Sequence, residues 1–421
     1  MSFDFSFSKF GEKIGRDGGI VKLMKDLGEA LTENQEMRMM GGGNPAAIPE
    51  VQSIWRKQIQ SILSEPEHLN TILGDYDGPS GNPIFLNALA ESLNEKYGWN
   101  LTSKNISITS GAQTAFFFLF NILAGESSEG PKKILLPITP EYIGYANQGI
   151  HDDLFISNPG LIEETGDKSF KYKVDFDNLK ITEEIAAICV SRPTNPSGNV
   201  LTDDEVNKLS SIAKSHGIPF IIDNAYGNPF PGAIYTSANP IYDDHVILTL
   251  SLSKLGLPGT RTGIVIGHEK IIEKISAANA VIGLANNNIG QAITAPLIKN
   301  REIFRISEGT IRPYYFEKMQ RAREYVRDSF SESTPYKIHD GEGAFFLWFW
   351  FPNLPITSKE LYERLKKKNV LVVPGEYFFY GTNEEWEHTR QCIRITFSQP
   401  DNVIKQGIKI LAEEVEKAYQ L

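Results

Sequence analysis

The stretch Thr249-Leu-Ser-Leu-Ser-Lys254-Leu-Gly-Leu-Pro-Gly-Thr-Arg261 predicts a strand that ends in a crevice. Residues 245–250 form the apolar, β-branched run of a buried strand, and hydroxyls, one lysine, a Gly/Pro-rich turn and one arginine follow it. Because a lysine in a crevice loses hydration, its pKa falls and its neutral amine becomes a nucleophile. Beside hydroxyls and an arginine, that amine suits an imine with a phosphate-bearing aldehyde. Taken alone, the tetrapeptide ending in Lys254 equally fits a lysine that extends to solvent at a strand end.

Length, charge and cysteine content restrict the class of protein. The chain has 421 residues, of which 41% are hydrophobic and 22% charged, which fits a large domain plus a smaller one. The net charge of -10 argues against a nucleic-acid partner. Cys189 and Cys392 each lie in an apolar run and are expected to be packed thiols, not a disulfide or metal site.

The N-terminal residues do not have the pattern of a signal peptide. The longest apolar runs, residues 115–123 and 344–351, are shorter than the roughly 20 residues that a membrane-spanning helix needs. We therefore expect a cytoplasmic protein without a membrane partner.

Polar side chains follow four further predicted strands, at residues 105–109, 134–138, 185–190 and 218–222. The first strand leads through a glycine turn into a helix start, an arrangement that offers backbone N–H groups to an anion. The aromatic residue after the second strand fits either a stacking plate or the core. The residues that follow these strands are Ser110-Gly111-Ala112-Gln113, Tyr142, Asn195, and Asp223 with Tyr226. A buried carboxylate at a strand end requires a cation or a donor.

Strands that alternate with helices predict an α/β sheet with a site along one edge. Helices are expected at residues 20–31, 48–63, 83–97, 114–123 and 202–216, the last with Thr202 as its cap and Glu205 in capping-box position. From about residue 300 the pattern changes to that of a smaller α+β domain. Its helices are expected at 311–330, 358–368 and 403–421, and its strands at 343–351, 370–373 and 391–397.

Four motifs stand in a fixed order along the chain: Asn195-Pro-Ser-Gly198, Asp223-Asn-Ala-Tyr226, Ser251-Leu-Ser-Lys254 and Gly259-Thr-Arg261. With this order and spacing, the chain resembles the fold-type I, pyridoxal-phosphate-dependent aminotransferases over nearly its whole length. The resemblance implies a large cofactor-binding domain at residues 46–300 with a mainly parallel seven-stranded sheet. It also implies a small, discontinuous α+β domain at residues 1–45 and 301–421 that closes on the substrate.

The resemblance implies a role for each motif in binding pyridoxal 5'-phosphate. Lys254 would hold the cofactor covalently and move the substrate's α-proton, and Asp223 would pair with the pyridine nitrogen. Asn195 and Tyr226 would donate to the ring's phenolic oxygen, and Tyr142 would stack on the ring. The phosphate would be bound by Gly111, Ala112, Gln113, Ser251, Ser253 and Arg261. Tyr76 would reach the phosphate of the neighbouring subunit, so the protein would be a homodimer.

The substrate groups follow from the same resemblance. Arg394, which alternates with apolar residues in Cys392-Ile-Arg394-Ile, would clamp the α-carboxylate with help from Gly43 and Asn195. The implied reaction is a ping-pong transamination in which L-valine, or a similar small apolar amino acid, and pyruvate give a 2-oxo acid and L-alanine. Discrimination by one or two methylenes is worth only about 1–3 kcal/mol, so some breadth in the amino acid is expected.

Two alternatives stay open at this point. The first is another enzyme on the same scaffold, a β-lyase, a decarboxylase or an aminotransferase with a different preference, because the fold does not fix the reaction. The second is a non-catalytic effector-binding module of a transcription regulator. That module would need an added basic DNA-binding domain, for which the acidic chain has no room before residue 40.

Overall fold

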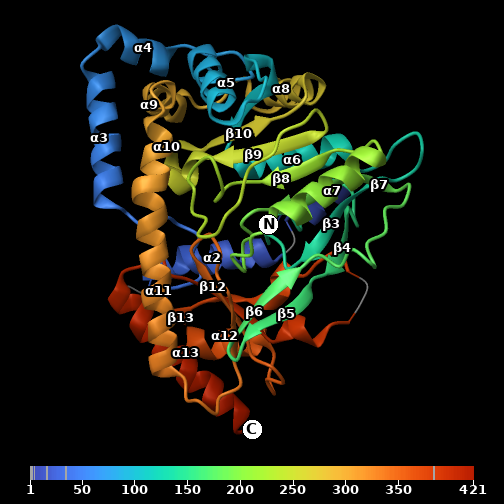
Figure 1. Ribbon diagram of the computed structural model, residues 1–421, viewed down its shortest axis with the longest axis vertical. Coiled ribbons are helices and arrows are strands. Elements are labelled where there is room, and N and C mark those ends of the chain that lie inside the picture. Colours follow the sequence, from blue (N-terminus) through green and yellow to red (C-terminus); the bar gives the residue numbers. More distant parts are fainter. Residues whose placement is uncertain (1–2, 4, 16–17, 34–35, 383–384) are drawn as a thin grey trace.

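The computed structural model describes residues 3, 5–15, 18–33, 36–382 and 385–421. A seven-stranded and a six-stranded sheet organise these residues, with a further two-stranded pairing of β1 (Arg38–Met39) and β13 (Val370–Leu371). Figure 1 shows the first sheet with its helices in the upper half and the second in the lower half, and α11 (Arg312–Ser329) runs down beside both.

The seven-stranded sheet confirms the predicted α/β class. Six of its strands are parallel to one another, and β10 alone runs antiparallel to its two neighbours. The strands, in order across the sheet, are β2 (Ile106–Ser110), β10 (Thr262–Ile266), β9 (Val246–Ser251), β8 (Phe220–Asp223), β7 (Ile185–Ser191), β3 (Lys133–Thr139) and β4 (Phe155–Pro159).

Helices cover both faces of this sheet because its strands are apolar on both sides. In β7, for example, Ala187 and Cys189 belong to one buried cluster and Ile188 and Val190 to the other. The first cluster contains side chains of α6 (Ala112–Leu123) and α8 (Glu269–Gly283). The second contains side chains of α5 (Pro83–Tyr97), α7 (Asp203–Ser215) and α9 (Asn288–Lys299). Both cysteines are buried and unpaired, as expected.

The six-stranded sheet has an unexpected origin in the chain. Its strands, in order, are β14 (Val373–Pro374), β15 (Cys392–Thr396), β12 (Phe346–Trp350), β11 (Lys337–His339), β6 (Ser169–Lys173) and β5 (Leu161–Gly166). The hairpin β5–β6 comes from between β4 and β7 of the other sheet, and the sequence reading did not contain it. The exposed side chains of β5 lack the apolar alternation that identifies a strand. The division into domains at residues 46–300 stays a prediction. At this hairpin the chain leaves the seven-stranded sheet after β4, contributes two strands to the six-stranded sheet, and returns at β7.

The other predicted elements are present with small shifts of their ends. The helices at residues 9–14, 66–74, 269–283, 288–299 and 302–306, and the strands at residues 38–39, 155–159 and 337–339, were not predicted. Helix α6 begins at Ala112, two residues before the predicted start, and the predicted strand at 370–373 is divided between β13 and β14. The capping box of Thr202 and Glu205 opens α7 as predicted. The other helices are α1 (Lys9–Ile14), α2 (Gly19–Glu33), α3 (Pro49–Leu63), α4 (Pro66–Gly74), α10 (Glu302–Ile306), α12 (Ser358–Lys366) and α13 (Asp401–Tyr419). Within the described ranges, none of the helices is long and apolar enough to cross a membrane.

Candidate active site

One cavity gathers residues from the ends of several strands of the seven-stranded sheet. The predicted site residues that line it are Ala112, Gln113, Tyr142, Asn195, Asp223, Tyr226, Ser251, Ser253, Lys254 and Arg261. An adjoining cleft is lined by Gly43 and Arg394 and shares Asn195 and Lys254 with the cavity. Tyr76 is not among the described residues that line either space, and its side chain is 83% exposed.

Lys254 lies in the 3₁₀ turn Leu252–Leu255, directly after β9. Its Nζ donates a hydrogen bond of 2.7 Å to the Gly43 carbonyl and lies 5.1 Å from the centre of the Tyr226 ring. Burial is the main cause that lowers the pKa of Lys254 to about 8, with smaller contributions from the nearby Arg394 and Arg261 and an opposing effect of Asp223. A substantial fraction of this amine is therefore neutral near pH 8.

Asp223 ends β8 and is 8% exposed. Its Oδ1 accepts hydrogen bonds from the Ala225 backbone N–H at 2.8 Å and from Thr249 Oγ1 at 3.4 Å, and its Oδ2 accepts one from the Tyr145 hydroxyl. Burial raises the pKa of this carboxyl, while the hydrogen bond from Tyr145 is the largest opposing influence. These donors hold the carboxylate in one orientation.

Tyr145, Glu141 and Ser191 join this network and were missed from the sequence. Glu141 is fully buried and accepts hydrogen bonds from Ser191 N at 2.7 Å, Ser191 Oγ at 2.6 Å and Tyr142 N at 2.7 Å. Burial raises the pKa of Glu141 to about 7. The only signal in the sequence was a second tyrosine three residues after Tyr142, and its link to Asp223 exists only once β3 and β8 lie in one sheet.

A backbone cradle lies where α6 begins. Gly111 has φ +86°, and a Cβ there would lie 2.2 Å from Nη2 of Arg261, so the arginine fills the space that a side chain would need. Ala112 and Gln113 form the first turn of α6, where backbone N–H groups point out of the helix. With Ser251 and Ser253 lining the same cavity, these donors suit a phosphate group.

Arg394 lies on β15, between β12 and β14, and is 2% exposed. Its Nη1 donates to Asn195 Oδ1 at 2.6 Å and its Nη2 to the Gly41 carbonyl at 2.6 Å. Its buried Nε has no hydrogen-bond partner among the described residues. Burial lowers the pKa of Arg394 to about 10, which leaves it charged at neutral pH. A buried guanidinium with a free donor fits a carboxylate ligand.

The donor set as a whole fits pyridoxal phosphate. Three cations, Lys254, Arg261 and Arg394, face one carboxylate, Asp223, among the ionisable residues that line the cavity and cleft. Anionic ligands would balance this charge. A nucleophilic amine and a carboxylate, together with an anion cradle, match an aldehyde on a nitrogen heterocycle that carries a phosphate.

The fold and this site define a class of enzyme that the comparisons confirm. The model of the aminotransferase class I and II family matches residues 46–411, and the chain belongs to this family. The protein is therefore an aminotransferase that uses pyridoxal phosphate.

Individual relatives are similar over almost the whole chain. The valine–pyruvate aminotransferase of Escherichia coli K12 is 48% identical over 98% of this chain and 99% of its own. The crystal structure of valine–pyruvate aminotransferase from Salmonella typhimurium LT2 has a TM-score of 0.88 and 46% identity, covering 96% of this chain and all of its own. A putative amino-acid aminotransferase from Psychrobacter arcticum 273-4 has a TM-score of 0.96 and 43% identity, covering 99% and 100%.

Proposed function

We propose that the protein transfers the amino group of L-valine, or a similar small apolar amino acid, to pyruvate, giving the 2-oxo acid and L-alanine by a ping-pong reaction. The observation that carries the proposal is the amine of Lys254, whose pKa is about 8, in a cavity shared with Asp223 and opening toward Arg394. The names of the two valine–pyruvate aminotransferases similar to this chain support the choice of substrates.

Different residues of the cavity would bind different parts of the cofactor. Lys254 would hold it covalently, Asp223 would keep a proton on its ring nitrogen, and Tyr142 would cover one ring face. Asn195 and Tyr226 would donate to the ring oxygen, and the Gly111–Arg261 cradle with Ser251 and Ser253 would bind the phosphate. The bound cofactor supplies an acceptor for the amino group and a ring that withdraws electrons from the substrate's Cα. The Lys254 amine would then carry the proton that leaves Cα.

The cleft beside the cavity supports a small apolar substrate. Ile20, Leu23 and Met24 of α2 line it together with the glycines 41–43. Its lining cations in the described part of the chain are Lys254, Arg261 and Arg394, which already have partners in the proposal. A dicarboxylate substrate would require a further cation for its side chain, whereas a branched aliphatic side chain requires only apolar contact. We assign the α-carboxylate to Arg394, with Gly43 and Asn195 beside it.

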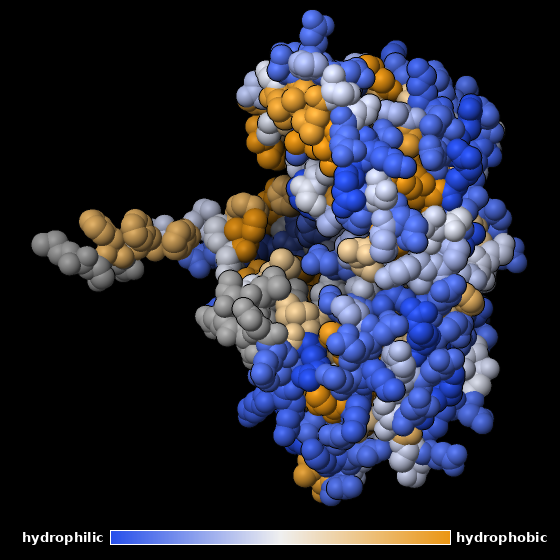
Figure 2. Space-filling model, turned by 90° about the vertical axis from the view of Figure 1, so that its left-hand side faces the viewer, coloured by the Kyte–Doolittle hydropathy of each residue, from blue (hydrophilic) through white to orange (hydrophobic). Residues whose placement is uncertain are grey.

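A homodimer belongs to the same proposal. Figure 2 shows apolar side chains gathered on the upper half of the molecule and on a segment that projects from its side. Large apolar side chains are exposed at Phe3, Phe5 and Phe7, and again at Val281 and Leu284. Such surface favours association with a second copy, which would place the exposed Tyr76 at the neighbouring phosphate cradle. The two unpaired cysteines support a cytoplasmic location.

A panel of half-reactions tests this function. Each amino acid is added alone to the holoenzyme, and the cofactor absorbance and the released oxo acid are measured. We expect valine and alanine to convert the cofactor reversibly to its amine form. Flat traces with both would refute the substrate assignment, and irreversible release of ammonia or carbon dioxide would indicate a lyase or a decarboxylase.

A further inference from the structure

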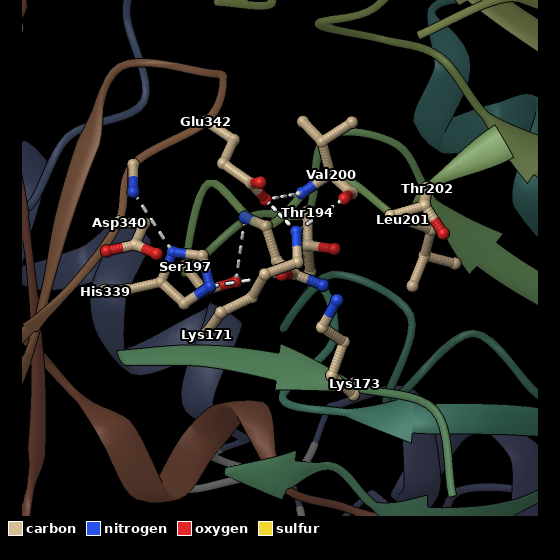
Figure 3. A network of polar contacts seen from close by, with 12 residues as sticks. Lys171, Lys173, Thr194, Ser197, Val200, Leu201, Thr202, His339, Asp340 and Glu342 are labelled. Carbon is tan, nitrogen blue, oxygen red and sulfur yellow. Dashed lines mark hydrogen bonds and ion pairs between the residues drawn. The ribbon is translucent and has the colours of Figure 1, made fainter. Parts of the chain in front are cut away.

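A partly buried ion pair lies behind the loop that carries Asn195, outside the cavity. Lys171 of β6 is 6% exposed, and its Nζ contacts the Glu342 carboxylate and donates to the Val200 carbonyl at 2.9 Å. The same Glu342 oxygen, Oε2, accepts the Val200 backbone N–H at 3.0 Å. Figure 3 shows the Lys171 amine directed at both Glu342 and Val200. The pair thus binds both backbone groups of one residue.

Further contacts fix the same loop to the segment after β11. The Glu342 backbone N–H donates to the Gly198 carbonyl at 3.1 Å, and His339 Nε2 lies 3.1 Å from Asn199 Oδ1. Since His339 Nδ1 accepts the Gly341 N–H, its Nε2 is the donor to Asn199. A Cβ on Gly198, which has φ +74°, would lie 2.6 Å from the Gly343 carbonyl oxygen. The loop therefore lies directly against residues 339–343.

The opposite side of this loop reaches the substrate cleft. Asn195 Oδ1 accepts from Arg394 Nη1 at 2.6 Å, and Arg394 belongs to β15 of the six-stranded sheet that also contains β6 and β11. One sheet therefore contacts the loop at two places, through Arg394 at Asn195 and through the ion pair at Val200. The Thr194 N–H, which donates to the Asn199 carbonyl at 2.8 Å, joins the two sides of the loop.

We propose that Lys171 and Glu342 are positioning residues for Asn195 and Arg394. The pair fixes the position of the 194–200 loop relative to the six-stranded sheet. This inference rests on the proposed roles of Asn195 toward the cofactor and of Arg394 toward the substrate carboxylate. An ion pair of this kind adds little net stability compared with apolar packing, so we assign it a role in fixing geometry. A small displacement of the loop would separate Asn195 from Arg394 and would change the hydrogen bond to the cofactor ring oxygen.

The variants separate positioning from stability. Lys171→Met alone leaves the partly buried Glu342 carboxylate without its cation and is expected to lower the melting temperature. The double variant Lys171→Met with Glu342→Gln contains no unpaired charge, and the amide oxygen of the introduced glutamine can still accept the Val200 N–H. The double variant lacks only the contacts that the Lys171 amine makes with the Val200 carbonyl and with residue 342. The matched control is Lys337→Met, which removes a 2.7 Å ion pair to the exposed Glu164 on the same sheet, away from the loop.

Three measurements are made on the double variant. The first two use the holoenzyme, and the third uses the apoenzyme. We expect KM for the amino acid to rise about tenfold with a smaller change in kcat, because Arg394 loses its alignment. The pH midpoint of the cofactor's visible absorbance should rise, because an Asn195 donor at the ring oxygen would favour the deprotonated form. Hydrogen exchange of residues 194–201 should become faster in the apoenzyme. The Lys337→Met control should match the wild type in all three.

The outcomes distinguish this inference from the proposed function. A double variant that folds, with KM, absorbance midpoint and loop exchange all as in the wild type, would overturn the positioning role. A wild-type enzyme that is inactive with valine and pyruvate would refute the proposed choice of substrates. The absorbance midpoint and the exchange of the loop would still report on the ion pair in that case.

Discussion

Tyr145→Phe is expected to lower kcat/KM through its effect on Asp223, whose carboxylate the Tyr145 hydroxyl contacts. The substitution removes the hydroxyl that donates to Asp223 Oδ2 and retains the donors Ala225 N and Thr249 Oγ1. A hydrogen bond to a buried charged group is worth about 1.5–3 kcal/mol. If the transition state depends fully on that carboxylate, kcat/KM falls about 10- to 150-fold.

The pH dependence of stability gives a second, independent readout on the apoenzyme. Burial raises the pKa of Asp223 in the folded protein, so ionisation of this carboxyl opposes folding above its ordinary pKa. Tyr145 reduces that cost, and its removal raises the pKa of Asp223 further. The variant should therefore be less stable by about 1.5–3 kcal/mol near pH 8. The difference should shrink as the pH falls, because the carboxyl becomes protonated in the folded and then in both states.

Tyr380→Phe is the matched control, since the Tyr380 hydroxyl is also a donor, in a partly buried position, but binds the Tyr142 carbonyl, at 2.9 Å. Urea denaturation of both variants at pH 8 and at pH 4, with steady-state kinetics at pH 8, makes the comparison. A Tyr145→Phe enzyme with wild-type kcat/KM, or a loss of stability that is the same at both pH values, would refute the reasoning about Asp223.

Three further predictions concern the other parts of the site. Gly111→Ala should weaken cofactor binding at least about tenfold, because the new Cβ would lie 2.2 Å from Arg261 Nη2 at a residue with φ +86°. The control is Gly259→Ala, whose Cβ would have no neighbour within 4 Å and which should bind the cofactor as the wild type does. Fluorescence titration measures both affinities. Uptake of pyridoxal phosphate by the apoenzyme should accelerate with pH up to about 8 and then level off, since only the neutral Lys254 amine reacts; a rate still rising steeply at pH 10 would contradict the lowered pKa of Lys254. Arg394→Lys should raise KM for valine about 10- to 100-fold while the cofactor spectrum stays near wild type, because an ammonium cannot bind a carboxylate bidentately; an unchanged KM would exclude this arginine from the carboxylate site.

The motifs and the strand pattern determined the class of fold and most of the cavity without reference to the tertiary structure. An apolar run followed within a few residues by Lys254, Asp223 or Asn195 can be read locally, because a strand end and the residues after it are close in the chain. The same locality made the capping box of α7 and the glycine turn before α6 predictable. These features depend on a few adjacent residues, so their signal survives in a single sequence.

Tertiary structure alone decided which distant residues meet. The hydrogen bond from Tyr145 to Asp223 joins residues 78 positions apart, and that from Arg394 to Asn195 spans 199 positions. Likewise, Lys171 and Glu342 are separated by 171 residues, and the polar–apolar alternation of the strand that carries Lys171 does not indicate this partner. Hydrogen bonds and ion pairs act over a few ångströms and leave no periodicity in the chain. Their partners become identifiable only after the two sheets have formed and brought them into contact.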